Sequence, residues 1–281
     1  MKAFEILTPG SYTTVQDGGR HGCLASGIPP SGALDNFAYI MANMLVGNPG
    51  EAAVLETTII GPTMKALVET DLAITGADSI VVLNGKPIDN WKTLRVKPYD
   101  IINIGLARSG CRSYIAMTGG VDVPVFMGSR SCFPAAGIGR VLTKGMVVDR
   151  FDAPLLNSPR TIENPPVYGE DIVLRAMRGP QSDLFKDVDV FFRMEFIVDV
   201  DASRAGYRLN SSPIIFGSED KEIISEVCLP GSVQVLPNGQ AIVLLVEQTV
   251  GGYPKIATII SDDISKIAQV KPGNKIYFKE V

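Results

Sequence analysis

Four segments rich in Gly or Pro hold the polar side chains of this sequence that are best placed to do chemistry. Two lie near the start of the chain, Thr13-Thr-Val-Gln-Asp-Gly-Gly-Arg20 and Gly27-Ile-Pro-Pro-Ser-Gly-Ala-Leu-Asp35, and two lie near its end, Ser203-Arg-Ala-Gly-Tyr-Arg-Leu209 and Glu247-Gln-Thr-Val-Gly-Gly-Tyr-Pro-Lys255. Glycine lets the backbone approach a ligand closely, and functional loops combine it with polar side chains. These segments are therefore candidate binding or catalytic loops.

The segments offer different chemical groups. The first places an amide, a carboxylate and a guanidinium within five residues. The third offers two guanidinium groups and a phenol, which suit a carboxylate, a carboxamide or a phosphate. The fourth follows a very apolar stretch and supplies backbone N–H groups together with Gln248, Thr249 and Lys255.

Each segment also has a purely structural interpretation. Asp17 could cap a turn that an ion pair of Arg20 holds in place. Ser31 could cap a following helix that carries Asp35 in its first turn. The third segment could be an exposed turn with solvated arginines, and the glycines of the fourth could form only a tight turn. The residues alone leave both interpretations open.

The elements that would position these loops are mostly strands, because short apolar segments alternate with Gly, Pro, Asn and Asp. Strands are expected at residues 53–60, 72–75, 80–83, 101–104, 113–117, 172–176, 214–216, 232–236, 241–246 and 276–278. A helix is predicted at 34–45, where apolar residues recur at helical spacing at Phe37, Ile40, Met41, Met44 and Leu45. Shorter helices are predicted at 182–186 and 264–269.

Two internal similarities and a Pro-rich stretch predict two domains. Val96-Lys-Pro-Tyr-Asp-Ile-Ile-Asn-Ile104 is similar to Val270-Lys-Pro-Gly-Asn-Lys-Ile-Tyr-Phe278, and a second pair of segments ends in Gly-Gly, at 119–120 and at 251–252. Ser158-Pro-Arg-Thr-Ile-Glu-Asn-Pro-Pro-Val167 is a natural boundary. We expect domains at 1–165 and 166–281.

Composition excludes several classes of function. The 281 residues contain one histidine, His21, so a multi-histidine metal site is excluded and no metal is expected. The net charge of −4, without a basic run, argues against nucleic acid as a partner. No G-x-x-x-x-G-K-[ST] loop is present, so nucleotide binding by this chain alone is not indicated.

The apolar runs and the cysteines indicate the cellular setting. No run approaches the roughly 20 apolar residues that span a bilayer, and the first residues resemble a strand more than a signal peptide. We therefore expect a cytoplasmic protein without membrane contact. Cys23, Cys111, Cys132 and Cys228 are too scattered for a C-x-x-C site, so buried, inert thiols are expected, with Cys132 as the exception if one exists.

At the same four segments the chain resembles the biotin-dependent carboxyltransferase subunit family. That family includes the C subunit of 5-oxoprolinase, allophanate hydrolase subunit 2-like proteins and the antagonist of a sporulation-kinase inhibitor, and it is similar to one half of the carboxyltransferase domain of urea carboxylase. The pattern P-G-x-x-T-T-V-Q-D-x-G-R-x-G matches Pro9 to Gly22, and G-V-P-P-S-G-A-M-D matches Gly27 to Asp35. Further matches include Arg178-Gly-Pro-Gln181, Pro230-Gly-Ser-Val-Gln234 and Gly251-Gly-Tyr-Pro-Lys255.

The resemblance implies a mainly β fold of two cyclophilin-like β-barrel domains with a few short helices. It also implies a sister subunit of the same fold. The favoured function is that of an ATP-dependent 5-oxoprolinase subunit, which with the sister subunit, and a third subunit, opens the 5-oxoproline lactam to glutamate. One alternative is transfer of a carboxyl group from carboxybiotin to a urea-like or amide-like acceptor. Another is a non-catalytic regulator that binds a kinase-inhibitor sister protein.

The same resemblance assigns provisional roles. No cofactor is expected to bind this chain tightly, since ATP would act through the complex and carboxybiotin would belong to a partner. The expected catalytic residues are Asp17, Arg20, Arg204 and Tyr207, which would stabilise charge on a carbonyl oxygen or transfer protons. The expected substrate-binding residues are Ser31, Asp35, Gln234, Gln248, Gly251, Gly252, Tyr253 and Lys255.

The sequence departs from the family pattern within these motifs. Gly18 replaces an apolar residue, His21 stands where Pro is frequent, and Ser203 replaces an asparagine. The loop after Arg130 is shorter, and Val227 and Val250 replace small or polar residues. These changes leave the substrate open, and they place His21 near the expected site without a catalytic role.

Overall fold

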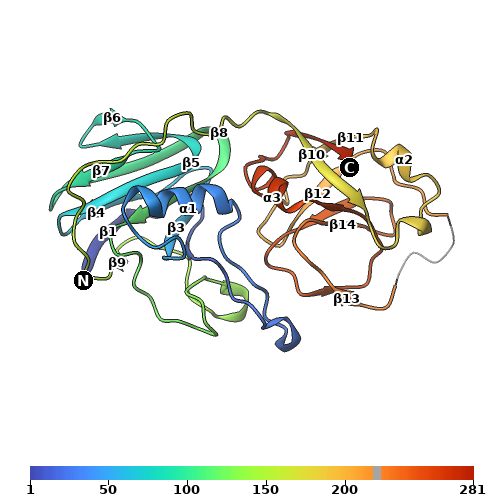
Figure 1. The fold of residues 1–281 in the computed structure, drawn as a ribbon, viewed down its shortest axis with the longest axis horizontal. Helices are drawn as coiled ribbons and strands as arrows, with labels where there is room; N and C mark the ends of the chain where they lie inside the picture. Colours follow the sequence, from blue (N-terminus) through green and yellow to red (C-terminus); the bar gives the residue numbers. More distant parts are fainter. Residues whose placement is uncertain (218–222) are drawn as a thin grey trace. The chain divides into compact units, whose positions relative to one another are not determined.

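The chain forms two compact units, each with its own sheet (Figure 1). The computed structural model describes residues 1–217 and 223–281. Unit 1 consists of Met1–His21 and Ser31–Tyr168, and unit 2 consists of Gly22–Pro30 and Gly169–Val281. Both units are built mainly from strands with a few short helices, so the predicted fold class is confirmed.

Unit 1 contains a nine-stranded sheet that curves into a half-barrel. Its strands are β1 (Lys2–Thr8), β2 (Thr13–Gln16), β3 (Val54–Thr58), β4 (Thr63–Ala66), β5 (Thr70–Leu83), β6 (Lys86–Ile88), β7 (Thr93–Val96), β8 (Ile101–Met117) and β9 (Val147–Asp149). The order is β2-β3-β8-β4-β1-β9, and β5 joins the sheet through β8 and also pairs with β6 and β7. Its core includes Phe4, Ile6, Leu55, Ile74 and Ile115.

Two strands of unit 1 are longer than predicted. The segments expected at 72–75 and 80–83 are parts of the single strand β5, and those at 101–104 and 113–117 are parts of β8. The pairing of β5 with β8 shifts register at three places, beginning at Gly76, which has φ +82°. A bulge lets a strand bend and continue, so the glycine marks a bend and not an end.

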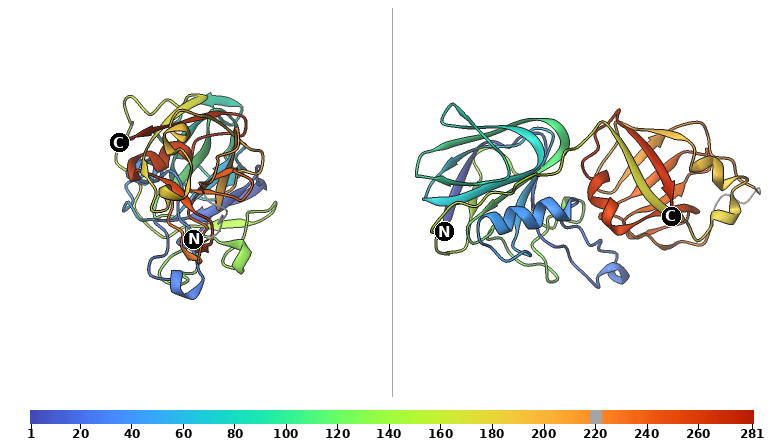
Figure 2. Two further views of the ribbon diagram at one scale, coloured as in Figure 1. Left: turned by 90° about the vertical axis from the view of Figure 1, so that its right-hand side faces the viewer. Right: turned by 45° about the horizontal axis from the view of Figure 1, so that its top comes forward.

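The helix α1 (Asn36–Leu45) packs on this sheet against β5 and β8 and runs along one side of it in Figure 2. The predicted start at residue 34 is two residues early, because Asp35 is the N-cap and accepts a hydrogen bond from Ala38 N. The predicted apolar face is also wrong in part, since Phe37 and Met44 are exposed. The small Ala38 and Ala42 face the core instead, and they bring the helix so close that Thr75 Oγ1 donates to Ala38 O at 2.6 Å.

Unit 2 contains a closed seven-stranded barrel in the order β10-β17-β14-β15-β12-β11-β18. Its strands are β10 (Asp171–Arg178), β11 (Glu195–Val198), β12 (Gly206–Asn210), β14 (Ser232–Val235), β15 (Ala241–Leu244), β17 (Lys255–Ile259) and β18 (Lys275–Glu280), and a separate ribbon pairs β13 (Glu226–Val227) with β16 (Val250–Gly251). The yellow β10 and the red β18 lie side by side in Figure 2, and their parallel pairing completes the barrel. Residues 214–216, predicted as a strand, form only an isolated bridge from Phe216 to Phe185.

The remaining helices are short. Unit 2 has the 3-10 turns η1 (Leu24–Ser26) and η3 (Ser182–Leu184) and the helices α2 (Val188–Phe191) and α3 (Ser261–Ile267), while the turn η2 (Pro134–Ala136) belongs to unit 1. The helix predicted at 182–186 forms only the 3-10 turn η3, which ends at the extended Phe185, and a separate helix, α2, begins after its N-cap Asp187. The helix predicted at 264–269 starts earlier, at Ser261. Within residues 1–217 and 223–281, no helix has the length and apolar character needed to cross a membrane.

Candidate functional site

In unit 1, Asp17 fastens the end of β2 to the loop at 129–131. Its carboxylate accepts hydrogen bonds from Gly19 N (2.9 Å), Arg130 N (2.6 Å) and the hydroxyls of Ser129 (2.6 Å) and Ser131 (2.5 Å). Burial on its own would raise the pKa of Asp17, but these hydrogen bonds hold it below its usual value. The geometry gives Asp17 a positioning role, and its expected role in proton transfer stays a prediction.

Arg20 also contacts this loop, through hydrogen bonds to backbone carbonyl groups. Its Nη2 donates to Ser131 O at 2.6 Å and its Nε to Phe126 O at 3.4 Å, and its guanidinium lies 6.0 Å from the centre of the Phe126 ring. Within the described part of the chain Arg20 forms no ion pair, and its Nη1 has no hydrogen-bond partner although the side chain is buried. The predicted ion pair of Arg20 is therefore wrong, whereas the predicted cap by Asp17 is confirmed by the hydrogen bond from Gly19 N.

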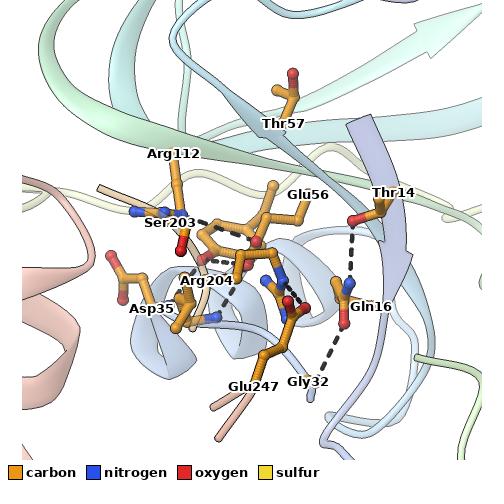
Figure 3. A network of polar contacts seen from close by, with 12 residues as sticks. Thr14, Gln16, Gly32, Asp35, Glu56, Thr57, Arg112, Ser203, Arg204 and Glu247 are labelled. Atoms are coloured by element: carbon orange, nitrogen blue, oxygen red, sulfur yellow. Dashed lines mark hydrogen bonds and ion pairs between the residues drawn. The ribbon is translucent and has the colours of Figure 1, made fainter. Parts of the chain in front are cut away.

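Gln16 connects β2 to the second segment (Figure 3). Its Nε2 donates to Thr14 Oγ1 (3.0 Å) and Cys132 O (3.2 Å), and its Oε1 accepts from Gly32 N (3.1 Å). Ser31, next to Gly32, has φ 54° and a buried hydroxyl for which the described residues provide no partner. Ser31 therefore does not cap α1, contrary to the prediction.

Asp35 belongs to a buried network that the sequence did not reveal. Besides capping α1, it accepts from Tyr168 OH at 3.1 Å, and its own N–H donates to Tyr114 OH at 2.7 Å. Tyr114 in turn donates to Glu56 Oε2 at 2.9 Å, and Arg112 lies 3.8 Å from Glu56 Oε1 (Figure 3). Burial, Glu56 and Asp35 raise the pKa of Tyr114 well above its usual value, so its hydroxyl stays protonated.

The structure of unit 2 brings three of the sequence motifs together around Lys255. Its ammonium contacts Glu226 Oε1 at 2.5 Å, and its backbone N–H donates to Gln181 Oε1 at 3.1 Å. Gln181 Nε2 also donates to Glu226 Oε1, at 2.8 Å. Hydrogen bonds from Lys255 and Gln181 lower the pKa of Glu226. Lys255 is buried while Glu226 is exposed, so this ion pair joins an ammonium group inside the unit to a carboxylate at its surface.

Gln234 lies beside this group, against the Gly251 backbone. Its Nε2 donates to Tyr253 O at 3.1 Å and lies 3.6 Å from Cys228 Sγ. A Cβ on Gly251 would lie 2.8 Å from Gln234 Nε2 and 2.9 Å from Cys228 Sγ, so only glycine fits there without displacing them. Burial raises the pKa of the Cys228 thiol.

The structure thus collects five predicted residues of unit 2, together with three that were not predicted, into one group. We call it the Lys255 cluster; its members are Gln181, Glu226, Cys228, Gln234, Gly251, Gly252, Tyr253 and Lys255. Gly252 is half-buried and its carbonyl accepts from Ile223 N at 2.9 Å. An ammonium group and two carboxamides near a carboxylate can hydrogen-bond a carbonyl oxygen and the N–H beside it.

The remaining predicted residues of unit 2 lie at other positions. Arg204 Nε donates to Glu247 Oε1 at 2.6 Å, and both side chains are largely buried (Figure 3). Tyr207 is buried on the same side of β12 as Leu209, and its hydroxyl donates to Val270 O at 3.4 Å. Gln248 is half-buried in the turn after β15, where its side chain makes no hydrogen bond to any described residue.

His21 and the four cysteines were also singled out in the sequence. His21 is exposed. All four cysteines are buried and none is in a disulfide, so Cys132 is not the accessible exception that was considered. Across residues 1–217 and 223–281, no three His, Cys, Asp or Glu side chains lie together as metal ligands would.

Comparison with known proteins places these arrangements in a family. Residues 26–280 match the family described as carboxyltransferase domain, subdomain A and B. The chain is 39% identical to the 5-oxoprolinase C subunit of Escherichia coli (strain K12), over 98% of this chain and 90% of that protein. It is 32% identical to urea amidolyase of Lachancea kluyveri, over 98% of this chain but only 17% of that protein.

Comparison with solved structures shows that the fold also matches that of a urea amidolyase. The crystal structure of the K. lactis urea amidolyase matches 100% of this chain with a TM-score of 0.92 and 29% identity, and the match covers 19% of that chain. This chain therefore spans less than a fifth of the urea amidolyases that it resembles, but nearly all of the bacterial subunit.

Proposed function

Since this chain belongs to the family of the carboxyltransferase domain, subdomain A and B, we propose that it is the C subunit of an ATP-dependent 5-oxoprolinase. With a sister subunit of the same fold and a third subunit, it would open the lactam of 5-oxoproline to glutamate. The observation that carries this proposal is the extent of the match to the E. coli C subunit, which is 98% of one chain and 90% of the other. A relative that this chain covers almost completely is a better guide to function than a much longer enzyme of which this chain matches less than a fifth.

The Lys255 cluster supports a role in handling a lactam. Ring opening places negative charge on the lactam oxygen when water adds to the carbonyl carbon, and fixed N–H donors stabilise that charge. Lys255 and the carboxamides of Gln181 and Gln234 are such donors, and each is held by hydrogen bonds before any ligand arrives. Glu226 could accept the lactam N–H.

Nucleotide handling is assigned to the partners. The sequence has no phosphate-binding loop of the G-x-x-x-x-G-K-[ST] type. ATP would therefore drive the reaction through the assembled complex, and the contribution of this chain would be to bind and orient the lactam.

Reconstitution tests the proposal. The chain is combined with its sister subunit and the third subunit, and ADP and glutamate are measured with and without 5-oxoproline. We expect both products only when the three subunits and 5-oxoproline are present. Lys255→Met should lower turnover at least tenfold, since a charged donor is lost, whereas Lys279→Met, at an exposed lysine of the same unit that has no partner among the described residues, should not change it. A folded complex that forms neither product refutes the proposal.

Carboxyl transfer is the second candidate, because the family description names it and the fold match to urea amidolyase extends over the whole chain. Carboxybiotin would then arrive on a partner, and a urea-like acceptor would occupy the same donors. Purification of the native complex separates the two candidates: a biotinylated partner favours carboxyl transfer, while an unbiotinylated set of three subunits favours 5-oxoprolinase.

A further inference from the structure

Unit 1 contains a cavity of about 690 Å³ that the proposed function does not use. The segment between Val121 and Asp149 forms most of its wall, and Val15 of β2 and Val148 of β9 contribute from the sheet. Phe126, Ile138 and Leu142 are further apolar members of the wall. Its volume lies in the range of small-molecule sites, roughly 300–1,000 Å³, which are also mostly apolar with a few polar groups.

Four charged side chains line this apolar wall, two of each sign. Asp122 and Asp149 are half-buried neighbours, since Asp122 N donates to Asp149 O at 2.9 Å. Arg130 is half-buried and Arg140 is exposed.

Within residues 1–217 and 223–281, these four charged side chains make almost no hydrogen bonds or ion pairs. Neither carboxylate accepts a hydrogen bond or forms an ion pair there, and the guanidinium of Arg140 has no partner. Arg130 uses only its Nε, which donates to Val123 O at 3.1 Å, and stacks its guanidinium 4.9 Å from the centre of the Phe151 ring. Elsewhere in the same unit a buried carboxylate has an ionic partner: Asp71 Oδ1 lies 2.8 Å from Arg95 Nε.

The arrangement of charges restricts the ligand that would fit. Two carboxylates in a mostly apolar wall give that wall a negative charge, which a bound cation would neutralise. Guanidinium groups favour a carboxylate, with which they form bidentate hydrogen bonds. A ligand that carries one charge of each sign on an apolar body satisfies all three features of the cavity. 5-Oxoproline does not qualify, because its lactam nitrogen carries no positive charge.

We propose that this cavity binds a free amino acid or dipeptide with an apolar side chain. Asp122 and Asp149 receive the ammonium group, Arg130 and Arg140 receive the carboxylate, and the apolar wall holds the side chain. The site lies wholly within unit 1 and is distinct from the Lys255 cluster, so it is independent of which reaction the complex catalyses.

Isothermal titration calorimetry on the full-length chain tests the site without any activity measurement. The probes are L-phenylalanine and leucyl-phenylalanine, each compared with its N-acetylated form, which lacks the ammonium, and with its C-terminal amide, which lacks the carboxylate. We expect saturable binding of at least one zwitterionic probe, and at least tenfold weaker binding of each blocked form, since a hydrogen bond to a charged group is lost. Absence of saturation at millimolar probe, or equal binding of zwitterionic and blocked forms, overturns the proposal.

Variants assign the two ends of the ligand. Asp122→Asn should weaken binding of the zwitterion about tenfold and leave binding of the N-acetylated form unchanged. Arg140→Gln should weaken binding of the zwitterion about tenfold and leave binding of the C-terminal amide unchanged. Lys144→Gln is the matched control, because Lys144 is exposed on the same segment and does not line the cavity. If the binding of every probe is the same in both variants as in the control, the charged residues do not form the site and the proposal is wrong.

Discussion

The carboxylate of Asp17 makes the stability of unit 1 depend on a single charge, and Asp17→Asn tests this. Oδ1 accepts three hydrogen bonds, from Gly19 N, Ser129 Oγ and Ser131 Oγ, and Oδ2 accepts one, from Arg130 N. An asparagine amide can keep its oxygen toward the three donors, but its NH₂ group then faces the Arg130 N–H. One hydrogen bond is lost, and the other three no longer involve a charge.

The expected cost follows from these contacts. A hydrogen bond to a charged group contributes about 1.5–3 kcal/mol, and a buried donor left without a partner adds to the loss, so Asp17→Asn should destabilise the protein by about 2–4 kcal/mol. Urea unfolding followed by tryptophan fluorescence measures it, because Trp91, the single tryptophan, is buried in unit 1. Asp152→Asn, at an exposed aspartate of the same unit, is the control and should change stability by less than about 0.5 kcal/mol.

The same comparison has a pH dependence of known sign. The hydrogen bonds hold the pKa of Asp17 in the folded protein below its usual value of 3.8. A carboxylate with a lowered folded-state pKa contributes stability above the unfolded pKa and loses it as the pH falls through the folded value. The difference between wild type and Asp17→Asn should therefore be constant from about pH 5 to 8 and shrink below about pH 4. A difference under about 0.5 kcal/mol at pH 7, or one that does not shrink in acid, would refute this account.

Three further experiments test other parts of the structure. Gly251→Ala should displace Gln234 and lower turnover of the reconstituted complex by about tenfold to a hundredfold, measured as 5-oxoproline-dependent ADP formation, and unchanged turnover would contradict the placement of the Lys255 cluster. Arg204→Met should cost about 3 kcal/mol in urea unfolding by leaving the carboxylate of Glu247 buried without its partner, and Glu247→Leu in the same chain should recover much of it. Gly273→Ala should raise the free energy of the folded state by about 1–2 kcal/mol, seen as a lower midpoint of thermal unfolding, because φ is +87° while its Cβ would meet no neighbour.

The periodicity of the sequence predicted some of the short strands, but it missed others, such as β11, β12 and β17, and it predicted a strand at 214–216 that does not form. The segments expected at 172–176, 232–236 and 276–278 correspond to β10, β14 and β18. The periodicity did not predict that β5 and β8 are single long strands. A glycine at a bulge, where the strand continues, cannot be distinguished in the sequence from a glycine at which a strand ends. The distinction depends on whether the partner strand continues, which is a tertiary property.

One internal similarity proved to be a shared turn. Lys97 and Lys271 stand at the same place in the two Val-Lys-Pro segments, and in each case the lysine N–H donates to the side chain three residues later, Asp100 at 2.7 Å and Asn274 at 2.9 Å. The position after Pro has φ +74° at Tyr99 and +87° at Gly273. The repeated letters therefore predicted local geometry through proline and a side-chain cap.

The polar groups missed at the sequence level are those whose partners lie far along the chain. Gln181 and Glu226 meet the predicted Lys255 only because unit 2 brings the turn before η3, strand β13 and the start of β17 together, and no spacing rule in the sequence encodes that. Glu56 did carry a signal, since a carboxylate inside the apolar run at 53–60 must find buried donors. A search for charged residues inside predicted strands would have found it.

The pairing of β18 between β10 and β11 has a consequence for biosynthesis. The strand that seals the barrel is also the last of its strands to leave the ribosome, and its partner β10 is the first. Until residues 275–280 emerge, the edges of β10 and β11 expose unpaired N–H and C=O groups, to which the edge strand of another nascent chain can add. Unit 2 therefore completes its fold only after its own synthesis is finished, and a translational stall before Lys275 would release a chain prone to aggregation.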